Sequence, residues 1–409
     1  MDTLIGEPVV DWVSLAPTDE RMQKWKQRGD RHQQTHKLRV ARERARRKDL
    51  EHRQTAIKRA LDAYRSIDNP DVTAIRIREG FIWTNDSRRA APRPAGERLS
   101  LAEEVQTRPP MTRLVERRRH SLHLLMTMFY VARMETSPGR LFINDHPNII
   151  RRSRAWPWLT LSGLNEDVPR SQRRNLRRTF NTAVQALADQ NLVGLTGDPK
   201  RSGYYDGFTL KMEDGSGDPY LVPADDFQQP DVISRPVDLP RRGAIKLSTS
   251  FFLHGWHLVL TDLELATFLA IIHRTAQLRD VPRSGEIVDR GVDLKKSERD
   301  THYGLSGEAY NSVHMLARLG LIELEDPMPN RYRSDEPEKK PDDESTSQTT
   351  AEAAGTPETQ GENPDGAQPD EGDSTKADSN KRVAYRLIYP VEGREFGSAV
   401  DTLLDTLAR

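Results

Sequence analysis

The chain has 409 residues, of which 35% are hydrophobic and 30% charged, and it contains no cysteine. The lack of cysteine excludes disulfide bridges, thiolate zinc sites and cysteine nucleophiles, and the length suggests two or three domains. Lys and Arg together number 62, as do Asp and Glu, yet residues 21–59 are strongly basic and residues 335–378 strongly acidic. Outside the acidic segment roughly ten positive charges remain in excess, a balance typical of nucleic-acid-binding proteins.

The N-terminal sequence MDTLIGEPVV has no basic flank ahead of an apolar run, so it does not resemble a secretory signal. The longest apolar run, SFFLHGWHLVL, is far shorter than the roughly 20 residues that a membrane span needs. We therefore expect a cytoplasmic protein that does not contact a membrane.

The N-terminal region predicts helices and short extended segments. Residues 17–67 are expected to form one long helix or two, with a break at Gly29 because glycine disfavours helix interiors. Residues 73–85 suggest a β-hairpin that turns at Glu79-Gly80. A Pro- and Arg-rich connection with one short helix, residues 86–110, follows.

Composition divides the chain into five regions. The acidic segment is rich in Asp, Glu, Ser, Thr, Gly, Pro and Gln, and such a composition is expected to stay disordered because it cannot bury enough apolar surface. The expected regions are a basic helical arm and linker at 1–110, a first globular unit at 111–222, a linker at 223–243, a second globular unit at 244–390 that contains the acidic insertion 334–380, and a C-terminal helix at 391–409.

The two globular units repeat one pattern of helix, cap and strand. Apolar residues at helical spacing predict a buried helix face in each unit, and Asn191 and Gly320 are expected to end the helices in the left-handed conformation. A short strand follows at once. The aligned positions are Val184, Leu187, Ala188, Leu192, Val193 and Leu195 in the first unit and Val313, Leu316, Ala317, Leu321, Ile322 and Leu324 in the second.

Each of these strands needs a returning partner, because a lone strand is not stable. In the first unit Leu192–Leu195 is expected to pair with residues 208–212 across a loop. In the second unit the β-rich segment left to pair with Leu321–Leu324 is KRVAYRLIYP at residues 381–390. That pairing would place the acidic insertion inside the second loop.

Helix, cap, strand, loop and returning strand are the signature of a winged helix. In the second unit, Thr261 and Glu264 form a capping box ahead of an amphipathic helix. Residues 295–302 would be the next helix and Ser306 would cap the third. The first unit follows the same plan with helices over 118–134 and 170–190. We therefore predict a mainly α protein with small β wings (α+β), built from two tandem winged-helix domains.

The third helix of a winged helix usually enters the major groove of DNA. In the first unit this helix carries five arginines on one face, suited to phosphate and guanine contacts, although a solvated face without a ligand is the alternative. The second unit offers a mixed set in which Asn can pair with adenine, whereas Tyr310 and His314 can instead pack against the domain. The candidate DNA-binding residues are Arg170, Arg173, Arg174, Arg177, Arg178, Lys200, Arg201, Lys295, Lys296, Arg299, Ser306, Tyr310, Asn311, His314 and Arg318.

The basic arm, residues 21–59, admits three interpretations: a helix that follows DNA phosphates, a dimerising helix, or a solvated surface. We favour non-specific DNA contact. No phosphate-binding Walker loop occurs, which argues against ATP hydrolysis of that kind. Two histidine pairs, His120 with His123 and His254 with His257, lie in apolar segments, where packing is favoured over metal binding. We expect no enzymatic activity, cofactor or metal.

Two winged helices behind basic helical material, with a helix-turn-helix-like string from Arg299 to Ile322, resemble the tandem winged-helix replication initiators of bacterial plasmids. The resemblance covers about residues 111–390 and lies in architecture. It implies that the protein binds repeated origin sites, that one unit helps a homodimer to form while the other reads the repeat, and that host replication proteins are partners. The long N-terminal region and the acidic insertion depart from that family. A transcriptional regulator and a DNA-bridging partition or structural protein are the alternatives.

Overall fold

The structure is a computed structural model, and its described residues make a mainly helical protein with three small two-stranded antiparallel sheets. Predictions for the short helix after Ser100, for Arg201 and for the acidic insertion fall outside the described residues. So do the side chains of residues 19–36, 170–171 and 309–311. The described ranges are 19–85, 105–117, 120–148, 155–164, 169–198, 200, 203–205, 207–223, 243–279, 291–325, 385–389 and 396–408.

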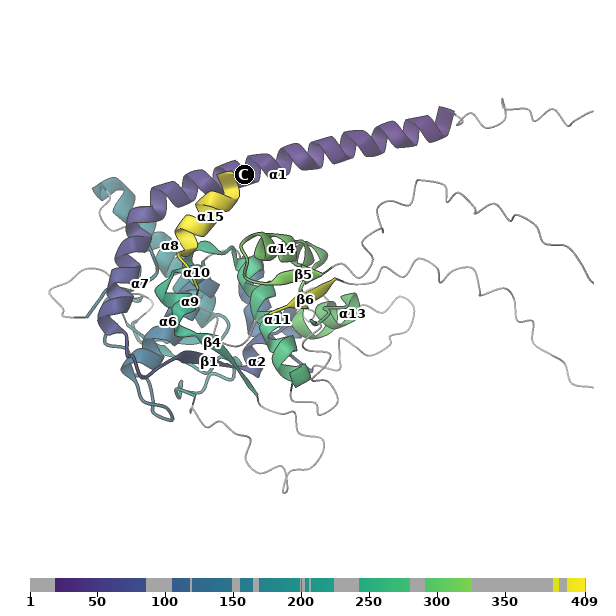
Figure 1. Ribbon diagram of the computed structural model, residues 1–409. Helices are drawn as coiled ribbons and strands as arrows, with labels where there is room; N and C mark the ends of the chain where they lie inside the picture. Colours follow the sequence, from purple (N-terminus) through teal and green to yellow (C-terminus); the bar gives the residue numbers. More distant parts are fainter. Residues whose placement is uncertain are drawn as a thin grey trace, which may run out of the picture.

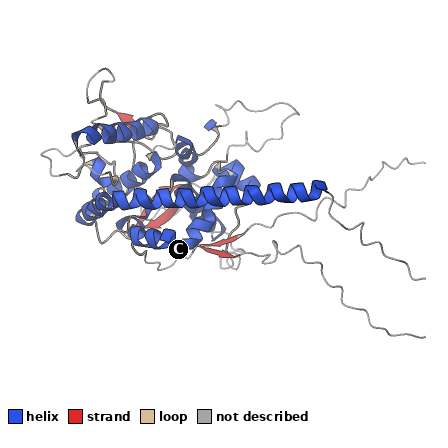
Figure 2. Ribbon diagram, turned by 90° about the horizontal axis from the view of Figure 1, so that it is seen from above, coloured by secondary structure: helices blue, strands red, loops and turns tan. Residues whose placement is uncertain are grey.

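The basic arm is one continuous helix, α1 (Asp19–Ile67), of 49 residues. Its first half projects beyond the body and its second half runs down one side (Figure 1), and the projection is also clear from above (Figure 2). The predicted break at Gly29 is wrong, because one glycine costs a helix only about 1 kcal/mol. From Leu50 onward the helix packs through a buried stripe that includes Ile57 and Tyr64.

The predicted hairpin at Glu79-Gly80 is also wrong. The chain forms β1 (Ala74–Arg78) and then turns directly into the short helix α2 (Glu79–Ile82). The partner of β1 is β4 (Ala244–Ser248), which joins it antiparallel with Ile75 opposite Leu247. Glu79 extends this pairing by one residue, because its backbone N–H donates to the carbonyl of Gly243 (2.8 Å) and its carboxylate accepts from the backbone N–H of Gly243 (3.1 Å).

The helices surround one connected cluster of buried apolar side chains, with α6 buried along almost its whole length. The capping box that begins α11 is confirmed: the Thr261 N–H donates to the Glu264 carboxylate (2.9 Å) and the Glu264 N–H donates to the Thr261 hydroxyl (3.2 Å). The further helices are α5 (Pro110–Arg117), α6 (Ser121–Glu135), α7 (Trp158–Leu161), α8 (Arg170–Ala188), α9 (Thr249–Leu253), α10 (Trp256–Val259), α11 (Asp262–Arg279), α13 (Lys296–Glu298), a π-helix (Arg299–Tyr303), α14 (Gly307–Arg318) and α15 (Ala399–Ala408).

Both predicted strand pairings are confirmed. In the first, β2 (Val193–Leu195) pairs antiparallel with β3 (Phe208–Leu210). In the second, β5 (Glu323–Glu325) pairs with β6 (Arg386–Ile388), placing Leu324 opposite Leu387. Asn191 and Gly320 take the left-handed conformation, with φ of 54° and 65°. The mainly helical α+β class is therefore confirmed, while the winged-helix assignment and the domain boundaries stay predictions.

Candidate nucleic-acid interface

Helix α8 is packed along one side and exposed along the other. Its buried side chains, among them Phe180 and Val184, occur in its second half. Residues 172–175 are all exposed, so a full turn near the helix start stands clear of the body. We define the arginine face as the exposed arginines of this helix whose side chains are described: Arg173, Arg174, Arg177 and Arg178.

The arginine face lies in a helix that contains no acidic residue. Arg173 and Arg177 are four residues apart, as are Arg174 and Arg178, so like charges neighbour one another along the helix. Such pairs destabilise a helix by a few tenths of a kcal/mol each. Helix stability therefore does not explain the arginine face, whereas a polyanionic ligand would remove the repulsion.

The β2–β3 hairpin is attached to the same helix. The Tyr205 hydroxyl, in the loop between the two strands, donates to the Gln185 side-chain carbonyl of α8 (3.1 Å). Lys200, in the same loop, is exposed, and its backbone N–H donates to the Asp198 carboxylate (2.9 Å). The sequence-predicted Lys200 therefore sits on an exposed loop that is anchored to the helix bearing the arginine face.

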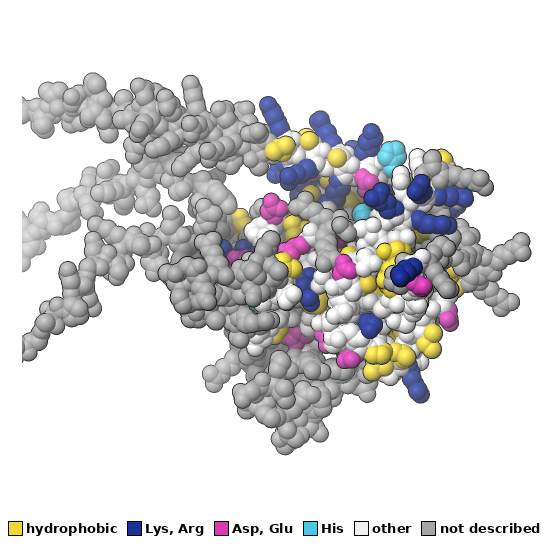
Figure 3. Space-filling model, turned by 180° about the vertical axis from the view of Figure 1, so that it is seen from behind, with side chains coloured by type: hydrophobic (Ala, Val, Ile, Leu, Met, Phe, Trp, Pro, Cys, Tyr) yellow, Lys and Arg dark blue, Asp and Glu magenta, His cyan; other side chains and the backbone are white. Residues whose placement is uncertain are grey.

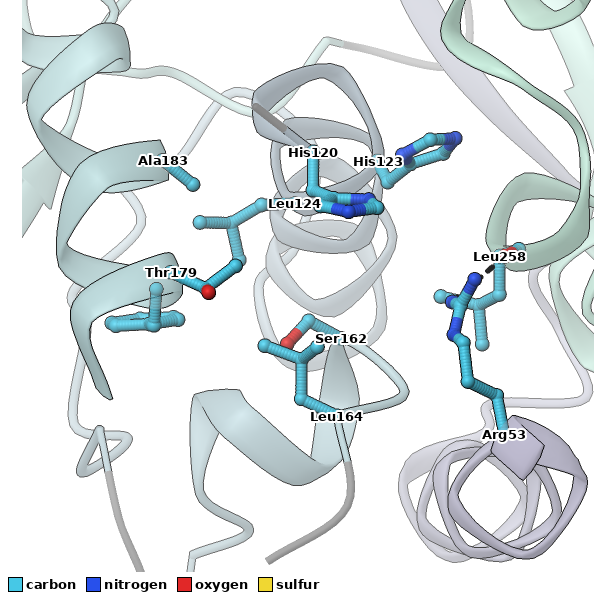
Figure 4. A pocket seen from close by; sticks show the side chains of 10 residues that line it. Arg53, His120, His123, Leu124, Ser162, Leu164, Thr179, Ala183 and Leu258 are labelled. Atoms are coloured by element: carbon cyan, nitrogen blue, oxygen red, sulfur yellow. Dashed lines mark hydrogen bonds between the residues drawn. The ribbon is translucent and has the colours of Figure 1, made fainter. Parts of the chain in front are cut away.

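A pocket separates α8 from α1. Arg53 of α1, His120 at the start of α6 and Thr179 of α8 line it, and His120 points into it between the two helices (Figure 4). The Arg53 guanidinium donates to the Leu258 carbonyl (3.1 Å), which fixes it at the pocket wall. Burial, followed by the nearby His123 and Arg53 charges, lowers the pKa of His120. The pocket wall therefore carries the Arg53 guanidinium, which also pairs with the Asp49 carboxylate (3.5 Å), and His120 is favoured in its neutral form.

The part of α1 that faces solvent is also basic. Seen from behind, Lys and Arg side chains gather along the upper edge, where α1 runs, and on the adjoining flank (Figure 3). Some of this charge is compensated within the helix, as in the Arg47–Glu51 ion pair (3.0 Å). Among the α1 residues before Leu50 whose side chains are described, the exposed basic ones are Lys37, Arg39, Arg42, Arg44, Arg47 and Lys48.

Two of the candidates in the second unit make contacts within the fold: Arg299 is buried, and Arg318 is partly exposed. Arg299 is only 7% exposed and donates to the Leu305 carbonyl (3.3 Å), so the predicted DNA-contacting residue lies inside the fold. Arg318 donates to the Glu43 carboxylate and to the Thr406 carbonyl (2.9 Å each), which joins α14 to α1 and α15. These contacts were invisible in the sequence because they join segments far apart along the chain.

The other second-unit candidates whose side chains are described are more accessible. Lys295, Lys296 and Ser306 are exposed, and the Lys295 ammonium lies 3.7 Å from the Asp293 carboxylate. His314 is exposed and lies edge-on to the Tyr385 ring, with centroids 5.3 Å apart. The structure thus gathers four arginines on α8 but does not assemble an equally dense cationic surface from the described residues of α14.

The two histidine pairs make contacts within the fold. His257 is fully buried and its Nε2 lies 3.0 Å from the Tyr64 hydroxyl. His254 and His123 each place a ring nitrogen 2.8 Å from a backbone carbonyl oxygen, of Ser250 and Leu260 respectively. Across the described ranges, no group of three or more potential metal ligands occurs.

Sequence reasoning passed over the amide side chains of α8, notably Gln172, Asn175 and Asn181. Extending the arginine spacing by one further helical step would have reached Asn181.

In the part of the chain that the structure describes, no helix is long and apolar enough to span a membrane. Comparison of the chain with protein-family models, curated proteins and solved structures finds no match.

Proposed function

We propose that the protein is a sequence-specific double-stranded DNA-binding protein with two tandem winged helices. The observation that carries the proposal is the arginine face of α8, which is exposed at the end of the helix that stands clear of the body and places the like charges of Arg174 and Arg178 one turn apart. The major groove is about 12 Å wide and admits an α-helix. Arginine binds both phosphate and the guanine edge through its planar fork of donors.

The proposal predicts how strongly DNA affinity depends on salt concentration. Each phosphate neutralised by Lys or Arg adds about −0.9 to the slope of log K against log salt concentration. If all four arginines of the arginine face contact phosphate, α8 alone contributes a slope of roughly −3.6. The exposed basic residues of α1 would steepen it further.

Within DNA-binding proteins, we propose replication initiation at repeated origin sites of a bacterial plasmid or mobile element. The support is the helix-cap-strand plan that occurs twice, in α8–β2–β3 and α14–β5–β6, in keeping with the resemblance to tandem winged-helix initiators. A homodimer and host replication proteins are the partners this proposal implies. A transcriptional regulator on the same scaffold is the alternative, and a DNA-bridging partition protein is a third.

A footprint of the full chain on DNA from its own locus tests the proposal. Protection of several direct repeats is the expected result for an initiator. Protection of one palindrome would instead assign the protein to transcription regulation. Uniform binding without a protected site would overturn sequence-specific recognition and favour a bridging protein.

A further inference from the structure

Helix α8 carries two amide side chains that continue the arginine face toward its C-terminal end. An α-helix turns by about 100° per residue, so residues three, four and seven positions apart share a face. Asn181 follows Arg174 by seven positions, Arg177 by four and Arg178 by three. Gln185 follows Asn181 by four. Both amides therefore lie along the line that the arginines define.

The two amides differ in what holds them. The Gln185 amide is committed to the fold, because its Nε2 donates to the Asp189 carboxylate (2.7 Å) and its Oε1 accepts from the Tyr205 hydroxyl (3.1 Å). Asn181 is partly exposed, and its side-chain amide has no hydrogen-bond partner among the described residues. Gln185 therefore links the β2–β3 loop to α8, whereas the donor and acceptor of the Asn181 amide are not used by the described residues.

Local folding gives no reason for Asn181. Asparagine ranks among the weaker helix formers, because its side chain competes for backbone hydrogen bonds. Asn181 sits well inside a 19-residue helix, away from either cap position. A residue that weakens the helix and bonds to nothing described in the chain is better explained by a ligand than by stability.

We infer that Asn181 reads an adenine in the major groove, an assignment that rests on the proposed DNA-binding function. An asparagine amide can donate to adenine N7 while accepting from adenine N6, which distinguishes adenine from the other bases. Arg174, Arg177 and Arg178 precede Asn181 on the same helix face and would hold the duplex by its phosphates. Phosphate contacts position a helix in the groove, and base contacts give it specificity.

Helix α8 would then carry residues with two different roles in DNA binding. The arginines contribute affinity that depends on salt, and Asn181 contributes discrimination that does not. The first unit would then recognise adenine through Asn181, in addition to the phosphate and guanine contacts that its arginines can make. A bidentate amide–adenine contact is expected to discriminate by roughly 5- to 150-fold against other bases.

The test compares Asn181→Ala with Gln172→Ala in the full-length protein. Gln172 is an exposed amide on the same helix, and it precedes Asn181 by nine residues, so it lies about 180° around the helix axis. The probes are a duplex with the footprinted sequence and a duplex of equal length and composition in shuffled order. Affinity for each probe is measured over a series of salt concentrations.

Asn181→Ala is expected to reduce the ratio of the two affinities by roughly 5- to 150-fold and to leave the salt slope unchanged. Gln172→Ala should change neither. Replacing adenines one at a time by 7-deazaadenine, which lacks the N7 acceptor, should weaken the wild type at one position and leave Asn181→Ala unaffected there.

An unchanged affinity ratio for Asn181→Ala would overturn the inference while leaving the proposed function intact. A wild-type protein that does not distinguish the two duplexes would overturn the proposed function, and the inference with it. A loss that is equal on both duplexes would make Asn181 a contributor to general affinity and would also overturn the inference.

Discussion

The regions α8–β2–β3 and α14–β5–β6 share their buried positions and differ in what they expose. Each has a helix packed through apolar residues, a left-handed residue after it, and a two-stranded antiparallel hairpin. In the first, the arginine face points to solvent. In the second, Arg318 is bound to Glu43 and Thr406 and so joins α14 to α1 and α15. The buried positions give the two regions a common plan, and the polar positions differ: those of α8 face solvent, whereas Arg318 of α14 bonds to its own protein.

Removing one buried strand residue from each hairpin tests the shared plan and should have the largest effect. Leu387 of β6 and Leu210 of β3 are 0% and 1% exposed. Truncating either to Ala should lower the free energy of unfolding by about 2–5 kcal/mol, because a cavity replaces the side chain. Urea denaturation of Leu387→Ala and Leu210→Ala measures both.

Thr209→Ala is the matched control, since Thr209 lies on the exposed side of β3, and it should change stability by less than about 1 kcal/mol. If Leu387→Ala were as stable as the wild type, β6 would not belong to the cooperative fold. The two regions would then not be equivalent.

Replacing arginines of the arginine face tests the proposed difference between the two helices. The double variant Arg174→Ala/Arg178→Ala removes two exposed charges from a helix whose packing lies on another side. The salt slope of DNA binding should become shallower by roughly two units, because each phosphate that is no longer neutralised removes about 0.9. The double variant Arg173→Ala/Arg174→Ala should also make the slope shallower, by roughly one to two units. An unchanged slope in both variants would remove α8 from the DNA interface.

The corresponding change in the second region should affect folding and leave DNA binding alone. Arg318→Ala removes hydrogen bonds to the Glu43 carboxylate and the Thr406 carbonyl. Because the Arg318 side chain is 40% exposed, the loss should be about 1 kcal/mol in unfolding free energy. Both the unfolding free energy and the salt slope of DNA binding are measured for Arg318→Ala. If Arg318→Ala made the salt slope as shallow as an α8 double variant does, the proposed difference between the two helices would be wrong.

Two histidines, one near each hairpin, should give the smallest and most local effects. Burial alone would lower the pKa of His146, but its hydrogen bond to Glu135 (2.8 Å) and the charge of that carboxylate raise it overall. Burial lowers the pKa of His314. The two pKa values should therefore shift in opposite directions from about 6.5.

The sign of each shift fixes its pH window. Stability from His146 is fully present below about pH 6.5 and is lost as pH rises through the raised folded-state pKa. Stability linked to neutral His314 is present above about pH 6.5 and is lost as pH falls through the lowered pKa. NMR titration of the histidine ring protons measures both, with His146→Gln and His314→Gln assigning the signals. A His146 that titrates below about 6.5 would contradict the assignment.

Sequence reasoning succeeded where the determinants are local or periodic. The caps at Asn191 and Gly320, the capping box at Thr261 and the buried stripe of α8 follow from residue type and spacing. The β5–β6 pairing was also within reach, because each strand lacked any other partner nearby. These features need only the positions of apolar and turn-forming residues.

Sequence reasoning failed where a partner lies far along the chain. The β1 strand was expected to pair with a segment close in sequence, but its partner is β4, and the Glu79 carboxylate accepts a hydrogen bond from Gly243 just before that strand. Arg299 was considered a phosphate contact on the helix that precedes the third helix, whereas it is buried and donates to the Leu305 carbonyl. The residues next to an arginine in the sequence do not determine which backbone carbonyl its guanidinium will hydrogen-bond in the folded protein.

The pairing of β6 with β5 has a consequence for the integrity of the polypeptide. Residues 385–389 are joined to the body by strand pairing with β5 and by backbone hydrogen bonds between Leu387 and Val292 (2.8 and 2.9 Å). Phe396, Ala399 and Leu403 are buried, so the end of the chain is held as well. A peptide bond broken between 326 and 384 would therefore leave two polypeptides that remain associated, and the C-terminal piece could be supplied as a separate peptide to complete the fold.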